Sequence, residues 1–501
     1  MNIFNPSCRL SLGWRTWLLG LSFAFVSLAV DTRANRFPSI YHPDESAKAR
    51  QILTGKYNFH HPMLMLTATR GLLALSGEPK DPEMVTIAGR WVSALFTSGA
   101  ILCLVLLAAL LSGPLASFIT GCLLVTNHQL FELAHYLKED AALLFGLSAF
   151  FLALAVFDRR PTPARALCLG ASLGLAVSGK FIGLAALPIA IVMLWNHRKT
   201  TACLSSLALC LGGAVMAFAL LNLPIFFSAH EFGKGFQREA EFVVSGHKGV
   251  TRSLPHGVYT SVFTESTNPA VWLLLVVFYV AFFRQRPRPR MLEWMIAFFP
   301  LGFTLLLSFS PKTHHRYFLP ATGVLLMLAA RGATTLGELL PRGRHSKCWG
   351  PLLALVIALA IQMPRFFDYY NAFSEDGRSA LAAYLVAHVP PGATIVQDGR
   401  VALDALRLPY NFRGKQFAAD EGTFDELRAQ GVEYIAVAEA DYGRFEGTPP
   451  RANYPGAANF ERRRDFYRRL FAEGEFLFEC KAGRLQYLQP HLKLYRLHPN
   501  R

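Results

Sequence analysis

Long apolar runs and short polar connections alternate over residues 15–363 of this chain. A helix that crosses a bilayer needs about 20 mostly apolar residues. Eleven runs reach or approach that length, and they cover residues 15–30, 91–112, 114–130, 141–157, 166–179, 181–196, 203–228, 268–283, 294–310, 317–330 and 349–363. The pattern predicts an α-helical polytopic membrane protein with about eleven transmembrane helices.

Two connections are much longer than the others, at residues 31–90 and 229–267. The first contains two short apolar stretches, 62–66 and 71–75, on either side of Arg70. Neither stretch is long enough to cross a bilayer, so we expect short helices that lie along the membrane surface. The shortest of the predicted spans, 166–179 and 317–330, must extend into their polar flanks.

The pattern changes after residue 363, where short apolar stretches alternate with helical patterns bounded by Gly and Pro. We predict two domains, a membrane domain at 1–363 and a soluble α/β domain at 364–501. Expected helices of the second domain lie at 379–389, 424–430 and 465–472, and expected strands lie at 393–396, 432–437, 475–480 and 492–497.

The distribution of charged residues predicts how the chain is oriented in the membrane. Hydrophobic residues make up 52% of the 501 residues, and the net charge is +16. Basic residues gather in alternate short connections, namely Arg159, Arg160, Arg165, Arg198, Lys199, Arg284, Arg286, Arg288, Arg290, Arg342, Arg344 and Lys347. By the positive-inside rule these connections and the N-terminus are cytoplasmic, in the inner (plasma) membrane. The connections at 31–90 and 229–267 and the C-terminal domain are then extracytoplasmic.

This distribution argues against nucleic acid as a partner. Residues 364–501 carry 19 Lys and Arg against 18 Asp and Glu, so the positive excess lies in the membrane part, where the positive-inside bias explains it. The first apolar run follows Arg9 and Arg15, and we interpret it as an uncleaved anchor. Cys480 is the single cysteine after residue 363, so no disulfide is expected within that domain.

Four polar groups fall at the outer ends of predicted spans under this topology. They are His42-Pro43-Asp44-Glu45, the stretch from His135 to Asp140, Lys180, and the stretch from Lys312 to Tyr317. A carboxylate can remove a proton from a hydroxyl group, and lysine and arginine can bind phosphate oxygens. Carboxylates and cations on one membrane face indicate transfer of a group from an anionic lipid carrier to an acceptor.

Each group also has a purely structural interpretation. Asp44 could cap a helix that begins at Glu45 or Ser46. Asp140 could be a helix N-terminal acid, and Lys180 could extend to the interface without binding anything. His314 and His315 could be ligands, acid/base groups or interfacial polar residues. Likewise, the basic run Arg462–Arg464 with Arg468 and Arg469 could bind lipid phosphates or form a solvated helix face.

Residues 40–330 resemble the GT-C superfamily of polyprenyl-phosphate-dependent glycosyltransferases, the bacterial group similar to protein mannosyltransferases and aminoarabinose transferases. The matching residues are His42-Pro43-Asp44-Glu45, His61-Pro62, Asp140, Gly179-Lys180-Phe181 and Arg316-Tyr317-Phe318-Leu319-Pro320. The chain departs from the family at Glu139, where a proline is frequent.

The resemblance implies a GT-C-like fold and transfer of a sugar from a polyprenyl-phosphate donor to a lipid, glycan or protein acceptor on the outer face, with inversion. It implies that Asp44 is the general base, that Glu45 and Asp140 shape the acceptor or metal side, and that Lys180 and Arg316 bind the donor phosphate. Candidate substrate contacts are His42, His61, His315 and Tyr317. A divalent metal is left open, and no other cofactor is expected.

Two other classes of protein remain as alternatives. A transporter or lipid flippase of envelope glycan assembly would also be polytopic, but its ionisable groups usually lie near the bilayer midplane. A scaffold subunit with a degenerate site would keep the topology and tolerate the loss of Asp44. The near absence of charge within the apolar runs favours the transferase.

Overall fold

The computed structural model describes residues 13–36, 42–77, 81–198, 203–245, 265–310, 314–339, 346–374, 376–406, 408–447, 449, 457–485 and 487–498. The chain forms two compact units. The first contains residues 1–35, 44–241 and 253–367, and the second contains 36–43, 242–252 and 368–501. Each unit is treated by itself below.

The membrane part consists of helices, and every predicted apolar run corresponds to one helix or to two consecutive helices, apart from a few residues at helix ends. Its elements are α1 (Trp14–Asp31), α2 (Pro43–Thr54), α3 (Leu64–Ser76), α4 (Pro82–Ser112), α5 (Pro114–Val125), α6 (His128–Ala134), α7 (Glu139–Arg159), α8 (Pro163–Gly179), η1 (Phe181–Ala186), α9 (Leu187–Asn196), α10 (Cys203–Leu221), α11 (Leu223–Phe227), α12 (Ala229–Ser245), α14 (Pro269–Arg284), α15 (Met291–Ser308), η3 (His315–Phe318), α16 (Leu319–Leu339) and α17 (Ser346–Ala372). The predicted fold class is confirmed.

Several helical stretches are long and apolar enough to cross a bilayer. By length and composition they are Pro82–Ser112, Glu139–Arg159, Leu204–Leu221, Met291–Ser308, His315–Leu339 and Trp349–His388. Shorter apolar helices are Leu64–Ser76, Pro114–Val125, Phe181–Asn196 and Pro269–Arg284. The number of spans therefore stays a prediction, because a short helix can cross only if it is extended by its neighbours or if the bilayer is thin.

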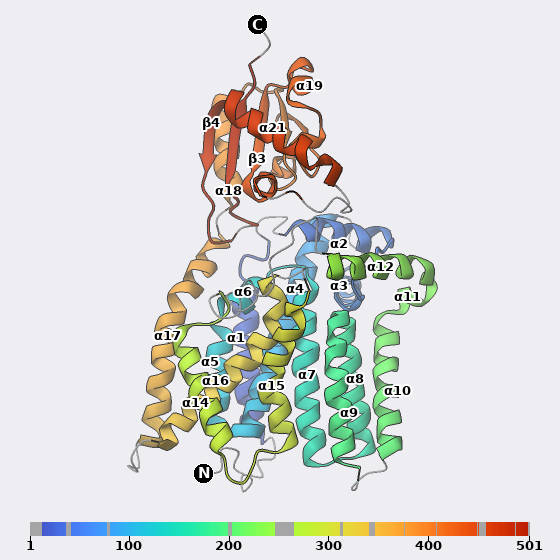
Figure 1. Cartoon of the computed structure of the whole chain (residues 1–501), viewed down its shortest axis with the longest axis vertical. Helices are drawn as coiled ribbons and strands as arrows, with labels where there is room; N and C mark the ends of the chain where they lie inside the picture. The colour runs from blue at the N-terminus through green and yellow to red at the C-terminus, as the bar shows by residue number, and fades with distance from the viewer. Residues whose placement is uncertain are drawn as a thin grey trace. The chain divides into compact units, whose positions relative to one another are not determined.

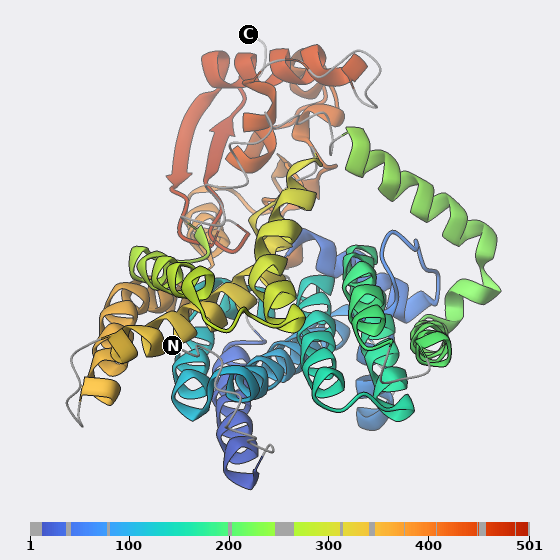
Figure 2. The same ribbon diagram turned by 60° about the horizontal axis from the view of Figure 1, so that its bottom comes forward.

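Long helices run side by side in alternating directions, and α7 packs on α4 and α8, while α8 packs on α10 (Figures 1 and 2). The short helices α2 and α12 lie across the ends of these helices (Figure 1). In the first long connection, the two apolar stretches around Arg70 form one continuous helix, α3. The expected break is absent because Thr67, Ala68, Thr69 and Arg70 are all compatible with helix.

The second unit is a five-stranded sheet with helices. Its elements are α18 (Gly377–His388), β1 (Thr394–Gln397), η4 (Leu403–Leu406), β2 (Asn411–Arg413), η5 (Ala418–Asp420), α19 (Phe424–Ala429), β3 (Tyr434–Ala438), α20 (Glu439–Tyr442), η6 (Gly443–Phe445), η7 (Ala457–Asn459), α21 (Phe460–Glu473), β4 (Glu475–Cys480) and β5 (Leu492–Arg496). The strand order is β2-β1-β3-β5-β4. Strand β1 pairs in parallel with β2 and β3, and β5 pairs antiparallel with β3 and β4.

The basic residues of α21 are bound to carboxylates of the same unit. Arg462 and Arg463 both contact Asp420, and Arg469 contacts Asp425 and Glu473. Arg464 and Arg468 form ion pairs within the helix, with Glu461 and Asp465 respectively. These contacts favour the interpretation of the basic run as a solvated, salt-bridged helix face.

Candidate active site

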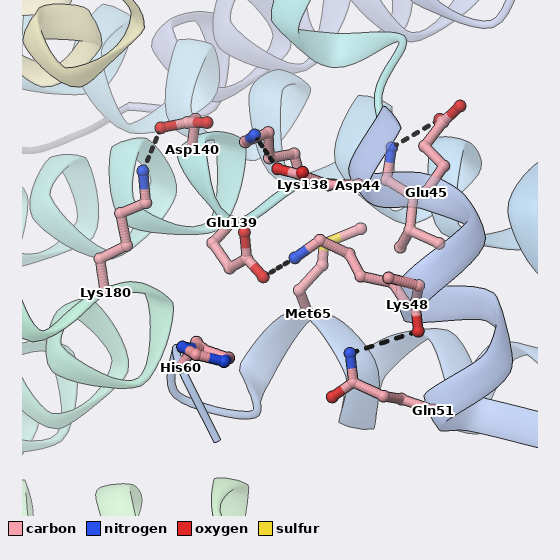
Figure 3. A network of polar contacts seen from close by, with 12 residues as sticks. Asp44, Glu45, Lys48, Gln51, His60, Met65, Lys138, Glu139, Asp140 and Lys180 are labelled. Atoms are coloured by element: carbon pink, nitrogen blue, oxygen red, sulfur yellow. Dashed lines mark hydrogen bonds and ion pairs between the residues drawn. The ribbon is translucent and has the colours of Figure 1, made fainter. Parts of the chain in front are cut away.

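Three consecutive residues at the start of α7 form ion pairs with other parts of the membrane unit (Figure 3). The ammonium group of Lys138 lies 2.5 Å from the Oδ2 atom of Asp44 on α2. Glu139 pairs with Lys48, which lies one turn after Asp44 on the same helix. Asp140 pairs with Lys180, between α8 and η1. The structure therefore brings together segments that are far apart in the sequence.

Asp44 is the exposed carboxylate of this cluster, with 51% of its side chain accessible. It lies in the first turn of α2, which begins at Pro43, so it is not at the N-cap position. The helix starts earlier than expected because proline is well suited to the first helical position. Asp44 is thus held by Lys138 while about half of its side chain is accessible, a geometry suitable for a base.

Glu45 points in another direction and is fully buried. Its carboxylate accepts two hydrogen bonds from Arg90, at 3.0 and 2.8 Å, and a third from the Leu137 backbone amide at 3.1 Å. The same Arg90 donates to the Asn35 carbonyl at 2.8 Å. This bidentate pair joins α2 to α4 and to the segment that leads into α7. The Glu45 carboxylate is thus enclosed by hydrogen-bond donors of the same unit.

Two cations surround Asp140. Besides Lys180, Arg316 of η3 approaches it, with the Nε atom 3.9 Å from Oδ2. The ring of Tyr317 lies beneath both cations, with its centroid 4.7 Å from the Lys180 ammonium and 5.4 Å from the Arg316 guanidinium. Asp140 therefore keeps Lys180 and Arg316 close together, and cation–π contacts with the Tyr317 ring help to hold both side chains in position.

The lysines differ in their electrostatic environment. Burial, and after it Arg316, lowers the pKa of Lys138 to about 8, against the opposing effect of Asp44 and Asp140. Burial also acts to lower the pKa of Lys180, but the Asp140 carboxylate outweighs it and the pKa is raised above its usual range. Lys180 therefore stays cationic at neutral pH, whereas Lys138 can lose its proton in mild alkali.

The close approach of Lys180 to Asp140 depends on a glycine. A Cβ atom at Gly179 would lie 2.7 Å from the backbone nitrogen of Leu143 and 2.8 Å from the carbonyl carbon of Ala142. The end of α8 and the first turn of α7 are thus in backbone contact. This contact brings Lys180, the next residue, within reach of Asp140.

The other histidine candidates lie in different surroundings. His61 is near enough to Glu139 for a Coulombic interaction. His315 faces Glu265, at 3.4 Å, and its carbonyl accepts a hydrogen bond from Gln129. His42 belongs to the second unit, where its ring packs on Tyr487 with centroids 4.3 Å apart. Within the first unit the structure therefore brings together Asp44, Asp140, Lys180, Arg316 and Tyr317.

Sequence reasoning missed several members of the site, namely Lys48, Lys138, Glu139 and Arg90 as partners, and Glu132. Glu132 lies on α6, where it accepts a hydrogen bond from Tyr136, and burial raises its pKa to about 7. Of these residues, Arg90 could have been noticed in the sequence, because a charged residue at the edge of an apolar run often has a functional or structural partner. Among the residues that the structure describes, no three His, Cys, Asp or Glu side chains gather as a metal site requires.

Comparison with known proteins finds similarity to glycosyltransferases in one segment of the sequence and in the fold. The model of the dolichyl-phosphate-mannose-protein mannosyltransferase family matches residues 70–234. No curated protein sequence matches the chain. The crystal structure of apo ArnT from Cupriavidus metallidurans is similar in fold, with a TM-score of 0.55 and 14% identity over 95% of this chain and 97% of ArnT.

A second solved structure has a similar fold. The oligosaccharyltransferase from Archaeoglobus fulgidus aligns with a TM-score of 0.51 and 12% identity, over 93% of this chain and 72% of that protein. At such low identity these similarities establish the fold alone. The resemblance expected from the sequence is therefore confirmed: the chain has the fold of the GT-C glycosyltransferases, and residues 70–234 match the protein mannosyltransferase family.

Proposed function

We propose that this protein is a membrane glycosyltransferase that moves a sugar from a polyprenyl-phosphate carrier to an acceptor on the outer face of the membrane. One observation carries the proposal. The half-exposed carboxylate of Asp44 is connected through the start of α7 to two cations, the buried Lys180 and the partly buried Arg316. These are the two chemical functions that such a transfer needs.

The reaction assigns one role to each. Asp44 accepts the proton of the acceptor hydroxyl while the hydroxyl oxygen attacks C1 of the sugar from the side opposite the phosphate. The bond between C1 and the phosphate oxygen breaks, and the configuration at C1 inverts. Polyprenyl phosphate leaves with a second negative charge, which Lys180 and Arg316 stabilise. Asp140 keeps both cations in place, and Glu45 acts only by fixing α2.

The charge of the site suits this donor. Lys48, Lys138, Lys180 and Arg316 contribute four positive charges, and Asp44, Glu139 and Asp140 contribute three negative charges, which leaves one net positive charge. A polyprenyl-phosphate sugar is a phosphodiester with one negative charge, so it neutralises the site. The relatives support the same class, since ArnT from Cupriavidus metallidurans has been solved with bound undecaprenyl phosphate.

The test is transfer by the purified protein. It is incubated with polyprenyl-phosphate sugars and with lipid, glycan and protein acceptors, and free polyprenyl phosphate is measured. We expect Asp44→Asn to lower the turnover roughly 10²- to 10⁴-fold without loss of folding, because an amide cannot accept the proton. Asp465→Asn is the matched control, since its carboxylate is 52% exposed and is also bound to one cation, Arg468.

Two results would contradict the proposal. Near wild-type transfer by a folded Asp44→Asn protein would remove Asp44 as the base and would leave Asp140 as the next candidate. If the protein in vesicles moves a lipid-linked sugar from one leaflet of the membrane to the other and releases no polyprenyl phosphate, a transporter or flippase is favoured instead.

A further inference from the structure

The pair formed by Lys48 and Glu139 has no role in the reaction described above. It is almost completely buried, with 8% of the lysine side chain and 3% of the glutamate side chain accessible. Lys48 donates its hydrogen bond to the Oε1 atom of Glu139. The other carboxylate oxygen, Oε2, is buried and has no hydrogen-bond partner among the residues that the structure describes.

A buried carboxylate oxygen without a donor is unfavourable, because it has lost its hydrogen bonds to water and gained none from the protein. Such atoms are rare in folded proteins and call for an explanation. In Figure 3 this oxygen points away from Lys48, toward the side where Asp140, Lys138 and Asp44 lie. The Glu139 Oε2 atom therefore faces Asp44, the proposed base, and Asp140, which holds the cations proposed to bind the phosphate.

The position of the pair along the chain indicates which part of the donor it would meet. Glu139 lies between Lys138, which holds the base Asp44, and Asp140, which holds the phosphate cations. Lys48 lies on the same face of α2 as Asp44, four residues later. In a donor whose phosphate is at Lys180 and Arg316, and whose C1 is within reach of an acceptor activated by Asp44, the sugar ring lies between these groups.

We propose that Lys48 and Glu139 recognise the sugar of the donor, and that the Glu139 Oε2 atom accepts a hydrogen bond from a sugar hydroxyl. This inference rests on the proposed function. Lys48 cancels the charge of Glu139, and the cluster as a whole is positive, so no net negative charge is present to hold a sugar ammonium group. The site therefore selects a neutral, hydroxylated sugar over an amino sugar.

Binding measurements test this without turnover. The probes are undecaprenyl-phosphate mannose, undecaprenyl-phosphate aminoarabinose and undecaprenyl phosphate, each measured with purified protein in lipid nanodiscs. The ratio of the affinity for the mannose lipid to the affinity for the sugarless lipid should be at least about tenfold higher in the wild-type protein than in a variant without the pair, the gain typical of a hydrogen bond to a charged group. The second phosphate charge of the sugarless lipid affects both proteins equally and cancels in this comparison. The wild-type protein should also bind the mannose lipid more tightly than the aminoarabinose lipid.

The decisive variant is Lys48→Met with Glu139→Gln, which removes both charges and so leaves no buried charge unpaired. It should bind undecaprenyl phosphate as the wild type does, and should bind the mannose lipid at least about tenfold more weakly than the wild type does. The matched control is Arg290→Met with Glu293→Gln, a pair at 2.9 Å at the start of α15 whose carboxylate is 1% exposed. It should bind both lipids as the wild type does.

Three outcomes would overturn the inference: unchanged binding of the mannose lipid by the variant, equal weakening of undecaprenyl phosphate and mannose-lipid binding in the variant, or tighter binding of the aminoarabinose lipid by the wild type. Failure of the proposed function has a different signature. In that case undecaprenyl phosphate does not bind to the wild-type protein, or binds without any effect of changing Lys180 and Arg316.

Discussion

Lys138 links the base to the phosphate cations, and its charge depends on pH. Its pKa is lowered to about 8, so the group is mainly protonated at neutral pH and neutral above that value. Loss of this proton removes the net positive charge of the site and the partner of Asp44. Both effects weaken the binding of an anionic donor.

We predict that kcat/KM for the donor falls as the pH rises above about 8 and that Lys138→Arg removes this fall, because a guanidinium group stays charged. The measurement is a pH profile of polyprenyl phosphate release. The control is Lys234→Arg, at an exposed lysine whose partner is Glu231; its profile should follow that of the wild type. An identical alkaline fall in Lys138→Arg would assign the titration to another group.

The donor phosphate should depend on both Lys180 and Arg316. We predict that Lys180→Gln and Arg316→Gln each weaken donor binding roughly 10- to 100-fold, the loss expected for a charge-assisted contact. Arg331→Gln is the matched control, because Arg331 is a buried cation on α16 and also lies close to a carboxylate, that of Glu338 at 3.5 Å. If both variants bind undecaprenyl phosphate like the wild type, the cations only neutralise Asp140.

At the scale of elements, the sequence predicted which helix ends carry the candidate site residues but not how these residues pair. Asp140, Lys180 and Arg316 could be placed because each lies at the end of an apolar run and the direction of the runs alternates. Their pairing could not, because it depends on side-chain directions and on the position of α2. The start of α2 at Pro43, two residues before Glu45, places Asp44 inside the helix and so argues against its interpretation as a cap. The strand β2 (Asn411–Arg413) was too short for an alternating pattern.

The contact between α8 and α7 gives a prediction at this scale. Gly179→Ala places a Cβ atom against the backbone of α7, so α8 must move away and Lys180 with it. We expect donor binding to fall about tenfold or more, with a modest loss of thermal stability. Gly212→Ala in α10 is the control, since nothing lies within 4 Å of its added Cβ atom and alanine favours helix. If Gly179→Ala binds the donor as tightly as the wild type does, donor binding does not depend on the contact between α8 and α7.

At the scale of the whole molecule, the proposed reaction requires all its groups on one side of the membrane. The ion pairs already place Asp44, Asp140, Lys180 and Arg316 together. The side itself is inferred from the basic connections, including Arg286 and Arg288, which by the positive-inside rule are cytoplasmic. With a cytoplasmic N-terminus and eleven spans, the C-terminal unit is then extracytoplasmic.

Cysteine labelling of intact spheroplasts tests this orientation. Arg288→Cys and Asp465→Cys each place a thiol at an exposed position, the first between α14 and α15 and the second on α21. We predict that a membrane-impermeant maleimide labels Cys at 465 in intact spheroplasts but labels Cys at 288 only after permeabilisation. The parent protein without either change corrects for the native cysteines. The reverse pattern would place the site in the cytoplasm, where a lipid-linked donor would have to be used before it crosses the membrane.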